Sequence, residues 1–224
     1  MNQKKTLHVV NGMEMYKYFK EKDFIDPDIM VPFNEAMCYG KTCEALFSDE
    51  FIDIRSNVHH VTPGQYTAIT LKPLQPLLRQ QYNDISLWFD ADMFCQMNIL
   101  TILAWLDCSQ YNGMIKLYIV DDHFRAVDTY TLKADGYDTY YKQVLIEKEN
   151  PHDIQPDVLK KGIERYLNYL KPDSDLMVFI RKHEDVPLKQ LVARLLENFK
   201  AYGLGDTQYL EIIQSYRRKN TVPF

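Results

Sequence analysis

The sequence predicts an α/β protein with a mostly parallel, Rossmann-like sheet, helices on both faces of the sheet, and a smaller helical C-terminal part. Short apolar runs alternate with longer amphipathic segments through the first 120 residues, as they do in βαβ units. The connections between them are short and rich in Gly, Pro, Asn and Asp. The last third is mainly helical in pattern. We therefore expect an α/β domain over residues 1–150 and a mainly helical domain over residues 151–224.

The N-terminal segment has the pattern of a βαβ opening. Residues 7–10 (LHVV) predict a buried strand, and a helical pattern follows the Asn-Gly pair at 11–12. Residues 28–31 (DIMV) predict the second strand, which we expect Pro32 to close. A strand, a helix and a strand in this order favour parallel pairing with a crossover helix.

The next segment predicts short helices. We expect one helix over residues 42–51, and a further helix start at residues 62–64 (TPG), because Pro suits the first turn of a helix. The stretch from residue 65 to residue 81 is amphipathic, but Pro73 and Pro76 confine it to two short helices.

The centre of the chain carries the clearest pattern. Residues 85–89 (ISLWF) predict a buried strand, and Asp90 or Asp92 then caps a strongly apolar helix. Residues 114–120 predict the next strand. Short turns between these elements indicate a mostly parallel sheet that is covered on both faces.

The remainder of the chain is less regular. The segment 121–156 gives no clear assignment. Helical patterns cover residues 157–170, 187–202 and 207–218, and residues 176–180 predict a short strand between the first two.

Composition limits the class of protein. The net charge of −5 and the pI of about 5.7 give no general attraction to nucleic acid, so we consider a nucleic-acid partner improbable. The four cysteines form no CxxC pair and have no histidine at zinc-finger spacing, so we expect no structural zinc site and assign no metal ligands. Without a secretory signal or a long apolar span, we expect a cytoplasmic protein with free thiols and no membrane contact.

Polar residues follow each predicted strand of the sheet. Ligands bind to open parallel sheets beyond the carboxyl ends of the strands, so these residues are the candidates for a shared cleft. The alternative is that turns and helix caps select Asp and Asn for local reasons. The strand ends carry Asn11 and Gly12, then Asn34 and Glu35, then Asp90 and Asp92, and finally Asp121, Asp122 and His123.

A ligand-binding cleft assigns a role to each of these groups. Carboxylates would position a ligand or a divalent cation, amide and backbone groups would hydrogen-bond it, and an arginine would neutralise an anion. Neither a GxGxxG nor a GxxxxGK[ST] motif is present, so no cofactor is indicated. The candidate ligand-binding residues are Asn11, Gly12, Asn34, Glu35, Arg55, Asp90, Asp92 and Gln96.

Two other features favour structural roles. No carboxylate partner is recognisable near the His59-His60 pair, so we expect this pair to cap a turn. Cys95 shares a helical face with Asp92 and Gln96, but no histidine is placed in sequence to activate it as a nucleophile.

Several of these segments resemble the bacterial family catalogued as domain of unknown function 1835. The resemblance rests on residues 7–12, on residues 28–35 and on residues 87–92 leading into 96–100. Residues 203–207, running into 209–213, resemble the companion segment that often follows that domain. The resemblance implies an α/β fold but no activity, and it does not extend to residues 121–156.

The C-terminal segment supports an alternative function. A Gly-Leu-Gly turn at residues 203–205 precedes a helix that ends in Arg217, Arg218 and Lys219, which would suit a regulatory module that binds DNA or a protein partner. The same cations would also stabilise the carboxyl end of a helix that packs on the domain. We favour the cleft, with a small polar or phosphorylated ligand that the protein binds or also transforms, because four separate segments support it.

Overall fold

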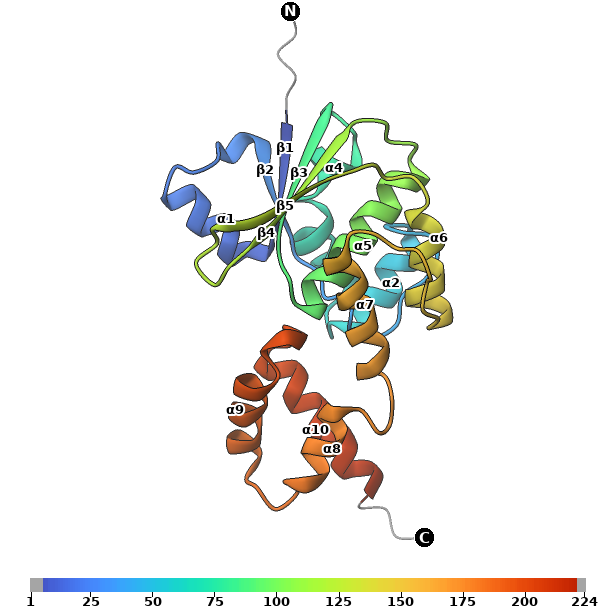
Figure 1. Ribbon diagram of the computed structural model, residues 1–224. Helices are drawn as coiled ribbons and strands as arrows, with labels where there is room; N and C mark the ends of the chain where they lie inside the picture. Colours follow the sequence, from blue (N-terminus) through green and yellow to red (C-terminus); the bar gives the residue numbers. More distant parts are fainter. Residues whose placement is uncertain (1–5, 221–224) are drawn as a thin grey trace, which may run out of the picture.

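The computed structural model describes residues 6–220, except for the side chains at positions 28, 219 and 220, and it contains one five-stranded sheet. The strand order is β2-β1-β3-β4-β5 (Figure 1). The first four strands are parallel, and β5 runs antiparallel to β4. The predicted α/β class is therefore confirmed. The strands are β1 (Thr6–Asn11), β2 (Met30–Phe33), β3 (Asp84–Asp90), β4 (Met114–Val120) and β5 (Ala126–Leu132).

Helices cover both faces of the sheet. Helix α1 (Gly12–Glu21) packs on one face, where Phe19 contacts Trp88 of β3. Helix α5 (Met93–Cys108) belongs to the larger core on the other face, together with Leu87 and Phe89 of β3. Because consecutive side chains of a strand point to opposite faces, β3 must be apolar at nearly every position. This double burial explains its uninterrupted ISLWF run.

Two further helices extend the layer that contains α5. They are α6 (Tyr137–Tyr141) and α7 (Asp157–Tyr169), and both pack against α5. Most of the residues of α5 are therefore buried, which explains why its sequence is apolar on all sides rather than along one stripe.

The connection from β2 to β3 contains short helical segments. They are α2 (Asp49–Val58), α3 (Pro63–Tyr66), a π-helical turn (Thr67–Leu71) and α4 (Gln75–Leu78). The helix start at residues 62–64 is confirmed and carries a complete capping box. The prediction of a helix over residues 42–51 is wrong. Ser48 accepts a hydrogen bond from the Phe51 amide and so sets the start of α2 at residue 49.

The second strand also differs from the prediction. Residues Pro27–Ile29 form a 3₁₀ turn, and β2 runs from Met30 to Phe33, so Pro32 lies inside the strand. Because β2 is an edge strand, a residue without an N–H can occupy it.

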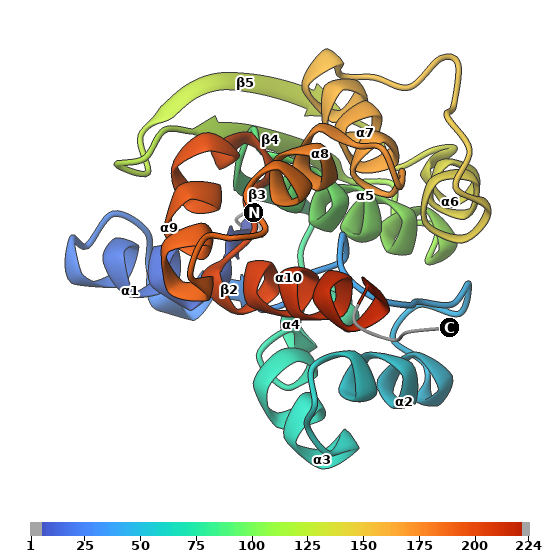
Figure 2. The ribbon, with the colours of Figure 1, turned by 90° about the horizontal axis from the view of Figure 1, so that it is seen from below.

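The last three helices form a separate layer. They are α8 (Asp175–Lys182), α9 (Leu188–Asn198) and α10 (Asp206–Asn220). The predicted strand at 176–180 is wrong, since Leu176 and Ile180 are the buried residues of α8 and lie one helical turn apart. Seen from below, α10 begins beside β2 and runs away from the sheet, in projection between α5 and α2 (Figure 2). Within residues 6–220, no helix combines the length and the apolar character that crossing a bilayer requires.

Candidate functional site

A cavity of about 590 Å³ lies at the carboxyl ends of β1 and β2. Its walls come from five separate parts of the chain: the start of α1, the segment after β2, the end of α2, the start of α5, and the start of α10 with the residues before it. The strand order reverses between β1 and β3, and the cavity lies beside that point, because its wall includes Asn11 at the end of β1 and Phe94 in the helix that follows β3. Ligands of open parallel sheets usually bind at such a point. Of the sequence-predicted residues, the cavity is lined by Asn11, Gly12, Asn34 and Glu35.

The start of α1 opens into the cavity. Gly12 has a φ of +73°, and no heavy atom lies within 4 Å of the position that a Cβ would take. The Asn11 side chain makes no capping bond to α1. It donates instead to Asp90 Oδ2 at 3.2 Å and to Cys95 Sγ at 3.0 Å. The first turn of α1 therefore lines the cavity without a side-chain cap from Asn11.

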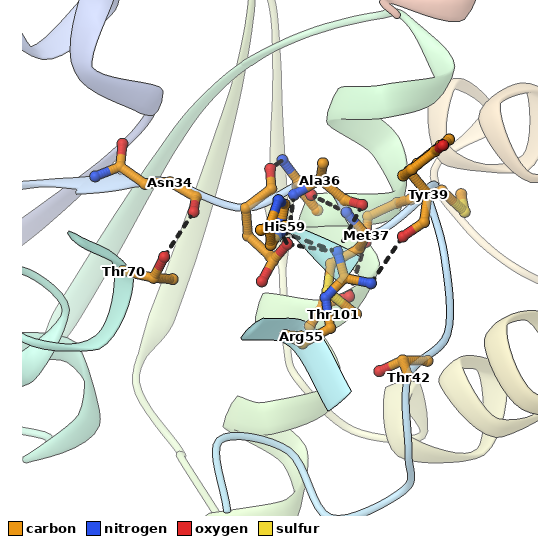
Figure 3. Close-up of polar contacts among 12 residues, drawn as sticks. Asn34, Ala36, Met37, Tyr39, Thr42, Arg55, His59, Thr70 and Thr101 are labelled. Atoms are coloured by element: carbon orange, nitrogen blue, oxygen red, sulfur yellow. Dashed lines mark hydrogen bonds and ion pairs between the residues drawn. The ribbon is translucent and has the colours of Figure 1, made fainter. Parts of the chain in front are cut away.

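Glu35 is the centre of a buried hydrogen-bond network that includes Arg55 and His59. Figure 3 shows how Arg55 and His59 lie relative to Ala36 and Tyr39. Glu35 Oε1 accepts from Arg55 Nη2 and His59 Nε2, both at 2.6 Å, and from the Ala36 amide at 2.7 Å. Its Oε2 accepts from the Tyr66 hydroxyl. Burial by itself would raise the pKa of Glu35. The hydrogen bond from His59, together with the charge and hydrogen bond of Arg55, outweighs burial and lowers the pKa to about 2.

Arg55 does not reach a ligand in this cavity. Its side chain is 0% exposed and pairs with Glu35. The guanidinium also donates to the carbonyls of Tyr39 at 2.7 Å, Lys41 at 2.9 Å and Ala36 at 2.9 Å. Arg55 therefore neutralises Glu35 and holds the segment after β2, rather than neutralising an anionic ligand as the sequence suggested.

Asp90 and Asp92 lie next to the cavity but not in its wall. Asp92 caps α5 by accepting from the Cys95 amide at 2.7 Å, and Gly203 packs directly on its carboxylate. Burial raises the pKa of Asp92 to about 6. It also raises the pKa of Asp90 and, strongly, that of the Cys95 thiol. These residues each present one ligand atom within 4.8 Å of the others, and Asn11 donates to both Asp90 Oδ2 and Cys95 Sγ.

Gln96 and Asn34 make contacts that connect segments of the fold. The Gln96 amide donates to the Asp90 carbonyl at 2.7 Å, and Gly162 of α7 packs closely against its side chain. Gln96 is fully buried and does not line the cavity. Asn34 lines the cavity while donating to the Ile69 carbonyl at 2.9 Å. Asp121, at the end of β4, instead pairs with Arg125 in the exposed turn before β5.

Sequence reasoning missed several residues of the cavity wall. His59 is the C-cap of α2, so the expected turn-capping role is correct, but it also bonds Glu35, which lies 24 positions earlier. The Tyr39 hydroxyl donates to Glu211 of α10, and His60 Nε2 lies 3.6 Å from the same carboxylate. No local sequence signal links Tyr39 or His60 to Glu211, which lies more than 150 positions later in the chain. The start of α10 contributes Asp206, Thr207 and Gln208.

The C-terminal cations have different surroundings. Arg217 donates to the carbonyls of Glu184 at 3.1 Å and Val186 at 2.9 Å, and so ties α10 to the α8–α9 connection. Arg218 is exposed and lines a second cavity beside α7. The side chain of Lys219 lies outside the described residues.

Comparison of the chain with protein-family models, with curated proteins and with solved structures found no match. The resemblance to domain of unknown function 1835 and its companion segment therefore stays a prediction.

Proposed function

We propose that the protein binds a small polar ligand in the cavity between the carboxyl edge of the sheet and the start of α10. The observation that carries this proposal is the composition of the wall, because strand ends, a helix start and the C-terminal helical layer all contribute to one cavity of about 590 Å³. That volume lies within the usual range of small-molecule sites.

The wall indicates how such a ligand would be held. Backbone amides at the start of α1, together with the Asn34 and Gln208 side chains, supply hydrogen-bonding groups. Phe33 and Phe94 supply apolar surface. Among the described residues that line the cavity there is no lysine or arginine, so a phosphorylated ligand would depend on the helix start rather than on a cation.

A thermal-shift screen tests this proposal. The purified protein is scanned with nucleotides, sugar phosphates, free sugars, amino acids and divalent cations. A ligand at a hundred times its dissociation constant adds about 2.7 kcal/mol to the stability of the native state, which gives a readable rise in Tm.

Two tryptophan substitutions make the result specific to the cavity. Thr207→Trp places a bulky side chain at an exposed position of the cavity wall, and it should abolish the shift. Thr129→Trp is the matched control, since Thr129 is an exposed residue of β5 outside the wall, and it should leave the shift intact. A shift that survives Thr207→Trp would place the ligand elsewhere, and the absence of any shift would count against the proposal.

A further inference from the structure

The ring of His59 is held in one orientation beside the cavity. His59 Nε2 lies 2.6 Å from Glu35 Oε1, and the ring stacks on Tyr66 with centroids 6.1 Å apart and planes 18° apart. The side chain is still 31% exposed and forms part of the cavity wall. A histidine that is fixed by a buried carboxylate on one side and open to a cavity on the other has the arrangement of a positioned acid–base group.

The contacts of Nε2 determine which ring nitrogen is free. Nε2 lies 2.6 Å from Glu35 Oε1, which can only accept, and 3.4 Å from Arg55 Nη2, which can only donate. The contact with Glu35 is much the shorter of the two, so it places the hydrogen of a neutral ring on Nε2. Nδ1 is then the unprotonated nitrogen, and no hydrogen bond to it is found among residues 6–220. Arg55, the Ala36 amide and Tyr66 hold Glu35 in turn, so the carboxylate cannot rotate away from the ring.

The start of α1 supplies a complementary group in the same cavity. Its first-turn amides have no side-chain cap, and the space at Gly12 is open. Backbone amides at a helix start stabilise negative charge that develops on an oxygen. A base and such a set of donors around one cavity are the parts that the attack of water on a carbonyl requires.

We propose that His59 is the general base of this cavity in the hydrolysis of a carboxylic ester, with Glu35 as the residue that positions it. The proposal rests on the proposed ligand-binding function and adds a reaction class to it. Nδ1 takes a proton from water while the water oxygen bonds to the ester carbonyl carbon, and the carbonyl oxygen becomes an oxyanion at the start of α1. The intermediate then expels the alkoxide, which takes the proton from Nδ1. One ester and one water give one acid and one alcohol.

Hydrolysis of p-nitrophenyl acetate tests the proposal, and the assay measures the p-nitrophenolate that is released. General acid–base groups contribute roughly 10²–10⁴-fold on matched substrates, so on this generic ester His59→Gln should lower the protein-dependent rate by at least about tenfold. His123→Gln is the matched control, because His123 is an exposed histidine in the β4–β5 turn, and it should leave the rate unchanged. The wild-type rate should also fall in D₂O, since a proton moves in the step.

A measurement on the wild-type protein guards against a variant that fails to fold. ¹⁵N NMR of His59 should show the tautomer with the hydrogen on Nε2, and a hydrogen on Nδ1 would overturn the proposal. Equal rates for His59→Gln and wild type would also overturn it. A ligand that binds the cavity without any His59-dependent hydrolysis would refute the catalytic inference and leave ligand binding standing. The absence of both ligand binding and hydrolysis would refute both.

Discussion

The pair formed by Glu35 and Arg55 allows a quantitative test of what holds the cavity wall together. Both side chains are 0% exposed, and their nitrogen and oxygen atoms are 2.6 Å apart. Glu35→Gln keeps the size of the side chain and one acceptor oxygen, but it removes the negative charge. Arg55 then keeps a buried positive charge whose remaining partners are backbone carbonyls.

Two estimates of the magnitude agree. Breaking a buried ion pair by removing one partner costs about 3–5 kcal/mol, and the three carbonyls around Arg55 place the expected cost near the lower end, at about 3 kcal/mol. The fall in the pKa of Glu35 from 4.5 to about 2 also corresponds to roughly 3 kcal/mol. The total free energy of unfolding of a domain is about 5–15 kcal/mol, so a loss of about 3 kcal/mol would be large.

Urea unfolding followed by tryptophan fluorescence measures this loss. The variant should show a lower midpoint at an unchanged slope. Asp121→Asn is the matched control, because the Arg125–Asp121 pair has the same 2.6 Å separation but is exposed, and the loss should be far smaller. A loss below about 1 kcal/mol in Glu35→Gln would refute the reasoning, since it would mean that the Arg55 charge is satisfied without Glu35.

The acid dependence gives a second readout of the same pair. The folded-state pKa of Glu35 is lower than its unfolded value, so the stability it contributes is present above pH 4.5 and is lost as the pH falls to about 2. The difference in stability between wild type and Glu35→Gln should therefore shrink over this range. A difference that stays constant between pH 4.5 and pH 2 would contradict the assignment.

Three further predictions concern the C-terminal layer and the Asp92 carboxylate on which Gly203 packs. Gly203→Ala should lower the free energy of unfolding in urea by about 2 kcal/mol or more, because φ is +67° and the new Cβ would lie 2.4 Å from the Asp92 carboxyl carbon. Gly136→Ala is the control, since Gly136 has a φ of +84° and open space around the new Cβ, and it should show the backbone cost alone. Asp92→Asn keeps the helix cap but removes a carboxylate whose raised pKa makes the wild-type protein less stable as the pH rises from 3.8 through about 6. The stability of the variant relative to wild type should therefore increase by roughly 2 kcal/mol over that window. A difference that stays constant would contradict the burial argument. Arg217→Ala should lower the Tm, because the carbonyls of Glu184 and Val186 lose a hydrogen-bond donor. An unchanged Tm together with the loss of salt-dependent DNA binding would favour the regulatory alternative instead.

Local signals predicted most of the sheet correctly. The apolar runs of β1, β3 and β4 are short and bounded by turn residues, so their type is clear without any tertiary information. The errors occurred where local preference was weak. The start of α2 was decided by the Ser48 cap, and residues 176–180 became helical because Ser174 caps them and their buried positions are four apart.

The sequence by itself determined the α/β class and the polar character of the strand ends, because apolar strand runs, helical periodicity and helix caps are patterns of residues that are close in the chain. Only the tertiary structure decided which of those polar groups meet. It buried Arg55 against Glu35, brought His59 to the same carboxylate, and placed Gly203 on Asp92. Each of these contacts joins residues between 20 and 111 positions apart, and their pairing follows from how the helices pack on the sheet rather than from any local pattern.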